Sequence, residues 1–207
     1  MVGFSILFLL SVLLKPSFYQ FFAFAGTLYT VAFFLRKASV DRFKYCLKVA
    51  AAFLPATIWT LYNMHYNVGS FALSPFTCIL INNETAAECV ISIVSGIAFP
   101  LFVLIVSIIK KNHSKMLCLA WLCYMIALLE FLLFIEPAEI GSLNMSYGYI
   151  CAMYILFIYS AVEFERMRQD KRISAPIGVM GGGLFMWHAL VGLYAFGVYS
   201  SSYYSII

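Results

Sequence analysis

Charged side chains are scarce in this sequence, and that shortage decides its class. Only 11% of the 207 residues are charged and 64% are hydrophobic, with a mean hydropathy of +0.94. Soluble domains average about 25% charged and about 45–50% apolar residues. A soluble domain of this length could not bury so much apolar surface, so most of it must face lipid. The length predicts one transmembrane domain over residues 1–207, without a separate soluble module.

Several signatures of enzymes and cofactor sites are also missing. The sequence contains no H-E-x-x-H, no Walker loop and no G-x-S-x-G. It has no C-x-x-C pair and no His/Cys cluster with zinc spacing. The run Gly181-Gly182-Gly183 follows no strand and precedes no Lys-Ser/Thr, which argues against a phosphate-binding loop. We therefore expect no metal ion and no cofactor.

What the sequence does contain is a series of apolar runs. A helix needs about 20 apolar residues to cross about 30 Å of hydrocarbon. Seven runs approach that length: Val2–Leu14, Phe18–Leu35, Tyr45–Met64, Ala87–Ile109, Met116–Ile135, Tyr147–Val162 and Ser174–Tyr199. They predict an all-α integral membrane protein, a bundle of about seven transmembrane helices.

The first of these runs is the least certain span. Its roughly 13 residues cover only about 20 Å as a helix. Residues 2–14 therefore span the bilayer, lie at its interface or re-enter it. No basic residues precede the run, and Lys15-Pro16-Ser17 follows it in place of a small-residue cleavage site. We expect it to stay in the mature chain instead of being removed as a signal peptide.

The basic residues alternate between loops and predict the orientation. All 13 Lys and Arg residues except Lys15 fall in three alternate loops or at the adjoining run ends. Such loops face the cytoplasm, which puts the N-terminus inside and the C-terminus outside. The net charge of +4 therefore reports topology and not nucleic-acid binding. The host membrane is predicted to be a plasma membrane or a bacterial inner membrane.

Two ionisable residues fall inside the apolar runs, Glu130 and His188. Ionisable groups in hydrocarbon are costly, which makes each a candidate functional residue. Each lies 14 residues from the inner end of its run, about 21 Å along a helix. At equal depth they could share a proton or bind a polar ligand, with Trp187 as an aromatic wall. The alternative is two separate residues, Glu130 protonated or facing an aqueous crevice and His188 bonded to a carbonyl.

The predicted outer ends of the runs carry further polar side chains. Asn63, His65 and Asn67 close the third run, and the carboxylates of Glu136 and Glu139 follow the fifth. Asn144 and Tyr147 open the sixth run. They form either the mouth of a binding cavity or helix ends that are polar because water touches them.

Proline, glycine and one short apolar segment could shape such a cavity or an interface. Pro55 and Pro100 lie inside runs, where proline removes a backbone donor and kinks a helix. Residues 70–81 are apolar but too short to span, so they form an interfacial loop or a re-entrant segment. Gly178 and Gly182 share a helix face, for packing within the monomer or in a homo-oligomer.

The six cysteines divide by position. Cys78 and Cys89 flank the same predicted outer loop, where an oxidising compartment would allow a disulfide. The other four lie near cytoplasmic helix ends or within runs, where thiols stay reduced or behave as small hydrophobes.

Three functional hypotheses follow from these patterns. The leading one is a small-molecule or ion transporter, or the membrane subunit of one, built around Glu130 and His188. The second is a non-catalytic membrane partner or sensor that oligomerises through Gly178 and Gly182 or contacts another membrane protein. The third is an intramembrane enzyme that acts on a lipid-linked substrate, with Glu130 or His188 as general base. In each case membrane lipids surround the chain.

Overall fold

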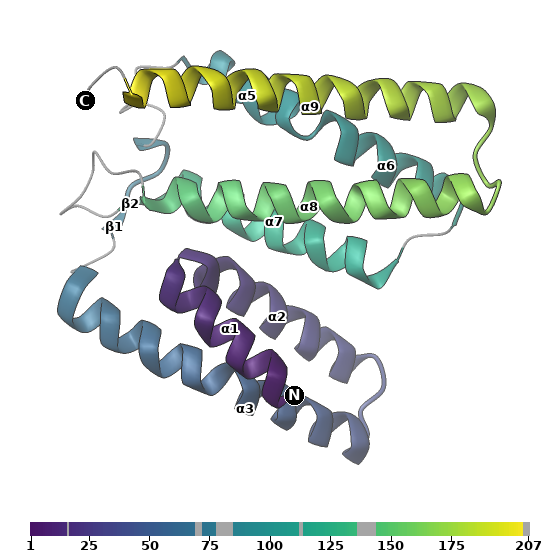
Figure 1. Ribbon diagram of the computed structural model, residues 1–207. Coiled ribbons are helices and arrows are strands. Elements are labelled where there is room, and N and C mark those ends of the chain that lie inside the picture. The colour runs from purple at the N-terminus through teal and green to yellow at the C-terminus, as the bar shows by residue number, and fades with distance from the viewer. Residues whose placement is uncertain (16, 69–71, 78–84, 112–113, 136–143, 205–207) are drawn as a thin grey trace. The chain divides into compact units, whose positions relative to one another are not determined.

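A computed structural model of the chain is built almost entirely from helices (Figure 1). It describes residues 1–15, 17–68, 72–77, 85–111, 114–135 and 144–204, without the side chains of 17, 67, 68, 86, 89, 144, 145 and 195–204. The helices are α1 (Val2–Leu14), α2 (Ser17–Leu35), α3 (Val40–Asn63), the π-helix η1 (Met64–Val68), α5 (Ala86–Gly96), α6 (Ala98–Ile109), α7 (Lys115–Leu133), α8 (Asn144–Gln169) and α9 (Ala175–Tyr204). Two-residue strands β1 (Ala72–Leu73) and β2 (Phe134–Ile135) complete the elements. The all-α class is confirmed.

Five of these helices are long and apolar enough to cross a membrane. They are the segments Phe18–Leu35, Val40–Tyr66, Lys115–Leu133, Ser146–Gln169 and Ala175–Tyr194. A sixth span results if Val90–Gly96 and Ala98–Ile109, which meet at a 57° bend, count together. Helix α1 is apolar but has only 13 residues. The chain is thus a polytopic membrane protein, while the count of seven and the sides of the two termini stay predictions.

The chain divides into two compact units, each described here by itself. Unit 1 comprises Met1–Cys89 and Cys118–Leu156, and unit 2 comprises Val90–Leu117 and Phe157–Ile207.

Unit 1 contains two apolar clusters. In the first, α1 runs parallel to α3: the rings of Phe8 and Phe53 lie 4.8 Å apart, and Val12 packs with Ala56 further along both helices. In the second, α2, α7 and α8 meet through buried Phe21, Ala25, Cys123, Ala127 and Ala152. Three of these five residues are alanines. Small side chains let helix backbones approach closely in lipid, where no hydrophobic force draws the helices together.

Unit 2 packs α6, α9 and the second half of α8 around phenylalanine rings. The ring of Phe99 lies 5.9 Å from that of Phe164 and 5.5 Å from that of Phe185. Gly181 of α9 is buried against this cluster. A Cβ added there would lie 2.8 Å from the ring of Phe102 and closer still to that of Phe164.

Several helix ends are closed by local side chains. The Ser39 hydroxyl accepts from the Arg42 N–H at the start of α3, and Ser114 accepts from the Leu117 N–H at the start of α7. Before α5, Thr85 and Glu88 form a reciprocal capping box. The Glu88 carboxylate accepts hydrogen bonds from the N–H and the hydroxyl of Thr85. These bonds hold the pKa of the Glu88 carboxyl below its usual range.

The C-terminal end of α7 is closed by a distant part of the chain. Strand β1 pairs with β2, which follows α7 directly. The Ser74 and Phe76 N–H groups donate to the Leu133 and Leu132 carbonyls at 2.9 and 2.7 Å. The described part of the apolar segment 70–81 is therefore a strand and turn that is hydrogen-bonded to the C-terminal end of α7. The remaining residues of that segment lie outside the described chain.

We predict that Gly181→Ala destabilises the protein by about 1–3 kcal/mol, because the added methyl overpacks the phenylalanine cluster. Gly183→Ala is the matched control, since a Cβ there meets no described atom within 4 Å. Thermal unfolding of both variants in the same detergent measures the difference. Equal midpoints for the two variants would contradict the packing role of Gly181.

Candidate functional site

Glu130 lies on α7, one turn before its end, in unit 1. It is half-buried and lies near the helix face that carries buried Cys123 and Ala127. Among the described residues, no side chain or backbone group forms a hydrogen bond or an ion pair with its carboxylate. A charge held inside a membrane needs a counter-ion, a proton or water. Glu130 is therefore the carboxylate in unit 1 whose presence the packing does not explain.

Aromatic and cationic side chains gather at the same end of α7. The ring of Phe131, next to Glu130, stacks on Tyr149 of α8 at 5.4 Å. The hydroxyls of Tyr149 and Tyr124 are 3.4 Å apart. The ammonium of Lys15, at the end of α1, lies 3.6 Å from the centre of the Tyr147 ring on α8. A cation over an aromatic face is attracted by the ring quadrupole, which here fixes α1 to α8.

The sequence pointed to Tyr147 as part of the outer rim, but not to Tyr124, Tyr149 or the contact of Lys15 with Tyr147. One signal was present, since Tyr124 and Phe131 are seven residues apart and therefore share a face of α7. Nothing in the chain order shows that α8 supplies the facing rings.

His188 lies on α9 in unit 2 and bonds to the broken span. Its Nε2 accepts a hydrogen bond of 3.2 Å from the Phe99 N–H, in the first turn of α6. Its ring also lies 5.7 Å from that of Phe157 on α8. Because Nε2 is the acceptor, the imidazole is neutral with its proton on Nδ1. The sequence alternative was a histidine bonded to a carbonyl; the contact in the structure is instead with a backbone N–H.

The break that His188 closes follows from proline. Pro100 has no N–H, and its ring excludes the carbonyl of the residue four positions earlier from a helical position. That residue is Gly96, the last of α5, and the bend of 57° lies there. The Phe99 N–H faces the same gap in the helical ladder, so it needs a partner from outside. In α3, by contrast, the helix continues through Pro55.

A second buried polar group of unit 2 lies on α8. The hydroxyl of Ser160 on α8 is fully buried and has no hydrogen-bond partner among the described residues. It follows Phe157 by about one helical turn. A buried hydroxyl without a partner is costly and is a position where a bound ligand or water can complete the hydrogen bonding.

The structure places the remaining predicted site residues separately. Asn63 ends α3 and is half-buried, and His65 is exposed in η1 with its ring against Tyr66. Trp187 is 60% exposed on α9. Glu130, Asn63 and His65 belong to unit 1, whereas His188 and Trp187 belong to unit 2. The pairing of Glu130 with His188 therefore stays a prediction.

Gly178 and Gly182 have open space beside them. A Cβ added at either one would meet no described atom within 4 Å, unlike at Gly181. Their use as a helix-packing face stays a prediction. The Cys78–Cys89 disulfide, Glu136 and Glu139 lie outside the described residues, as do the side chains of Asn67 and Asn144. The cysteines that are described are free, and the described residues contain no group of three or more potential metal ligands.

Comparison with known proteins adds no family to this picture. No family model, no curated protein and no solved structure matches the chain. The function must therefore be argued from the site residues.

We predict that His188→Phe destabilises unit 2 by about 1–3 kcal/mol, because it leaves the buried Phe99 N–H without an acceptor. The variant keeps an aromatic ring beside Phe157. Hydrogen exchange at the Phe99 amide should accelerate, and thermal unfolding should occur at a lower temperature. Trp187→Phe, at an exposed neighbouring position, is the control and should change neither value. Unchanged exchange at Phe99 in His188→Phe would show that the hydrogen bond is not formed in the membrane protein.

Proposed function

We propose that this chain is a small-molecule or ion transporter, or the membrane subunit of one. The observation that carries the proposal is the broken span α5–α6. At its break the Phe99 N–H donates a hydrogen bond to His188 of α9 and not to a carbonyl of its own helix. Discontinuous membrane helices bring backbone polar groups to the depth where transporters bind their substrates and ions. Irregular backbone at that depth persists only where protein or a water-filled cavity covers it.

The hydrogen bond between the Phe99 N–H and His188 can be exchanged for one to a bound solute. A histidine from another helix is a single, reversible partner for the Phe99 N–H. A solute with an acceptor oxygen can replace it there, and the unpaired Ser160 hydroxyl supplies a second polar contact one turn from Phe157. Apolar walls with a few placed polar groups are typical of small-molecule sites.

Glu130 contributes a different property. Its half-buried carboxyl has no partner among the described residues, so it can gain or lose a proton or bind a cation without breaking a structural contact. Coupling of a solute to a proton or cation requires a group of this kind. In this proposal His188 positions the broken span and Glu130 carries the exchangeable charge.

The test is uptake by the purified protein in liposomes. The liposomes are incubated with a defined mixture of inorganic ions, amino acids, sugars and nucleosides, and their contents are measured by mass spectrometry. We expect at least one solute to enter faster than into protein-free liposomes. Glu130→Gln should slow that uptake by about tenfold or more, because the neutral amide cannot exchange a proton.

Glu165→Gln is the matched control for Glu130→Gln. Glu165 is a partly exposed carboxylate at the far end of α8, paired with Arg168 at 2.7 Å. Its replacement should leave uptake unchanged. Contents equal to those of protein-free liposomes for every solute class would contradict transport by this chain alone. Equal loss in both variants would remove Glu130 from the proposal.

A second candidate function rests on the open face of α9. Gly178 and Gly182 are one turn apart, and no described atom fills the space beside them. This face suits close approach of another membrane helix, from a second copy or from a partner protein. In this alternative the chain is a non-catalytic partner or sensor.

We predict that Gly182→Cys, with the six native cysteines replaced by serine, forms a disulfide-linked dimer in native membranes under mild oxidation. Met180→Cys is the control, because residue 180 is exposed on the opposite side of α9. A dimer at position 182 alone supports the glycine interface. Absence of a dimer at 182, or equal dimers at both positions, would count against it.

A further inference from the structure

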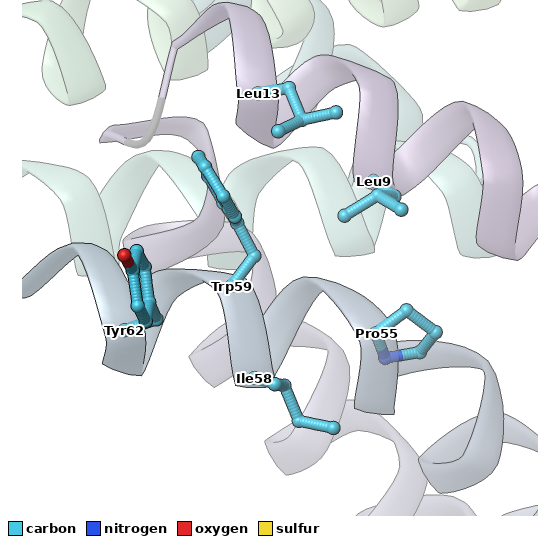
Figure 2. A pocket seen from close by; sticks show the side chains of 6 residues that line it. All are labelled: Leu9, Leu13, Pro55, Ile58, Trp59 and Tyr62. Atoms are coloured by element: carbon cyan, nitrogen blue, oxygen red, sulfur yellow. The ribbon is translucent and has the colours of Figure 1, made fainter.

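A groove of about 490 Å³ lies between α1 and α3 of unit 1 (Figure 2). Two leucines of α1 and four residues of α3 line it: Leu9, Leu13, Pro55, Ile58, Trp59 and Tyr62. The polar side-chain atoms among these six residues are the Tyr62 hydroxyl and the Trp59 indole N–H. The volume falls within the roughly 300–1,000 Å³ that is typical of ligand sites.

The short length of α1 explains why the groove exists. The two helices run side by side from the Phe8–Phe53 contact, but α1 has 13 residues and α3 has 24. They therefore cover about 20 Å and about 36 Å. Near the end of α1, the last turns of α3 lose their neighbour. Pro55 widens the space, because its ring occupies less room than a long side chain.

The groove faces the surroundings of the chain and not a packed core. Leu13 is 45% exposed, Ile58 is 60% exposed and Tyr62 is 53% exposed. The α3 residues belong to the candidate membrane span Val40–Tyr66, and the groove opens on the outside of unit 1. An occupant of the groove must therefore be apolar along its length and must come from within the bilayer.

The lining favours a lipid chain over another helix. Helix–helix contacts in membranes use small residues that let two backbones approach. This groove is lined instead by leucine, isoleucine, tryptophan and tyrosine, which hold a helix backbone away. A flexible chain of methylene groups fits between such side chains.

A row of aromatic rings leads from the groove to the end of the span. The rings of Trp59 and Tyr62 lie 5.9 Å apart, and those of Tyr62 and Tyr66 lie 4.7 Å apart. The exposed His65 ring lies beside Tyr66 at 4.7 Å. Tryptophan and tyrosine are typical of the boundary between hydrocarbon and headgroups. The row therefore marks the level at which the polar part of a lipid lies.

We propose that this groove binds one acyl chain of a phospholipid from the bilayer. The chain lies along Leu9, Leu13, Ile58 and Trp59, and the glycerol backbone lies level with Tyr66 and His65. The proposal is independent of transport, since it concerns α1 and α3 alone.

Trp59 provides a direct reporter, because bromine atoms on an acyl chain quench indole fluorescence on contact. The chain has three tryptophans. One variant keeps Trp59 alone (Trp121→Phe, Trp187→Phe), and a second keeps Trp187 alone (Trp59→Phe, Trp121→Phe). Each purified variant, in excess detergent, is titrated with phosphatidylcholine brominated in the middle of its acyl chains.

Binding in the groove and random contact with lipid predict opposite orders of quenching for Trp59 and Trp187. Trp187 is 60% exposed, whereas Trp59 is only half-buried at the groove wall, so random contact with lipid quenches Trp187 more strongly. A bound acyl chain instead quenches Trp59 saturably, with about half of the effect at the dissociation constant. The Trp187 signal should change little, because the detergent dilutes unbound lipid.

Filling the groove provides the second measurement. Leu13→Phe with Ile58→Phe, in the Trp59-only protein, should abolish the saturable quenching. The proposal would be overturned if Trp59 were quenched no more strongly than Trp187, or if saturable quenching persisted in the filled variant. It would also be overturned if the protein formed a dimer whose interface shielded Trp59 from the brominated lipid. The comparison of the two single-tryptophan proteins decides the question even if the filled variant does not fold.

Discussion

A membrane offers no water to the backbone, so every N–H and C=O group at depth must find a partner in the protein. Within the long helices of this chain the helical ladder supplies those partners. In the part of the chain that the structure describes, this ladder is interrupted at the break between α5 and α6 and at the end of α7. In both, a distant segment completes the hydrogen bonding, His188 at the break and the Ser74 and Phe76 N–H groups at the end of α7. These long-range bonds therefore decide which helices must lie together within each unit.

The two prolines show how the same residue type gives different results. Pro100 lies four residues after Gly96, and the helix breaks there because the proline ring displaces the Gly96 carbonyl from a helical position. A glycine at that position tolerates the altered backbone. Pro55 lies in the middle of α3, which continues for two further turns. There its effect is on the surface, where a small ring among larger side chains leaves the groove beside α1.

The class of the protein and most of its helices could be predicted from the sequence, because hydropathy is a property of each segment alone. The run Phe18–Leu35 coincides with a candidate span, and the run Tyr45–Met64 lies within the candidate span Val40–Tyr66. Tertiary partners could not be predicted in the same way. Spacing drew attention to Gly178 and Gly182. The glycine of α9 that the structure shows buried is Gly181, because the facing rings of Phe102 and Phe164 come from other helices. Similarly, Pro100 predicted a kink in the run Ala87–Ile109, but nothing in the run shows that His188, nearly ninety residues later, accepts from the Phe99 N–H beside the 57° bend.

Glu130 and His188 looked equivalent in the sequence, but they differ in whether they form a structural contact. His188 stabilises the structure, since removal of its ring nitrogen leaves the buried Phe99 N–H without this acceptor. Glu130 has no such task among the described residues, although Phe131 beside it is fixed against Tyr149. A carboxylate in a membrane helix reduces stability and, without a packing role, is best explained by a function that requires its charge. Glu130 is therefore the stronger candidate for the residue that exchanges a proton or a cation, and His188 for the one that holds the two halves of the broken span together.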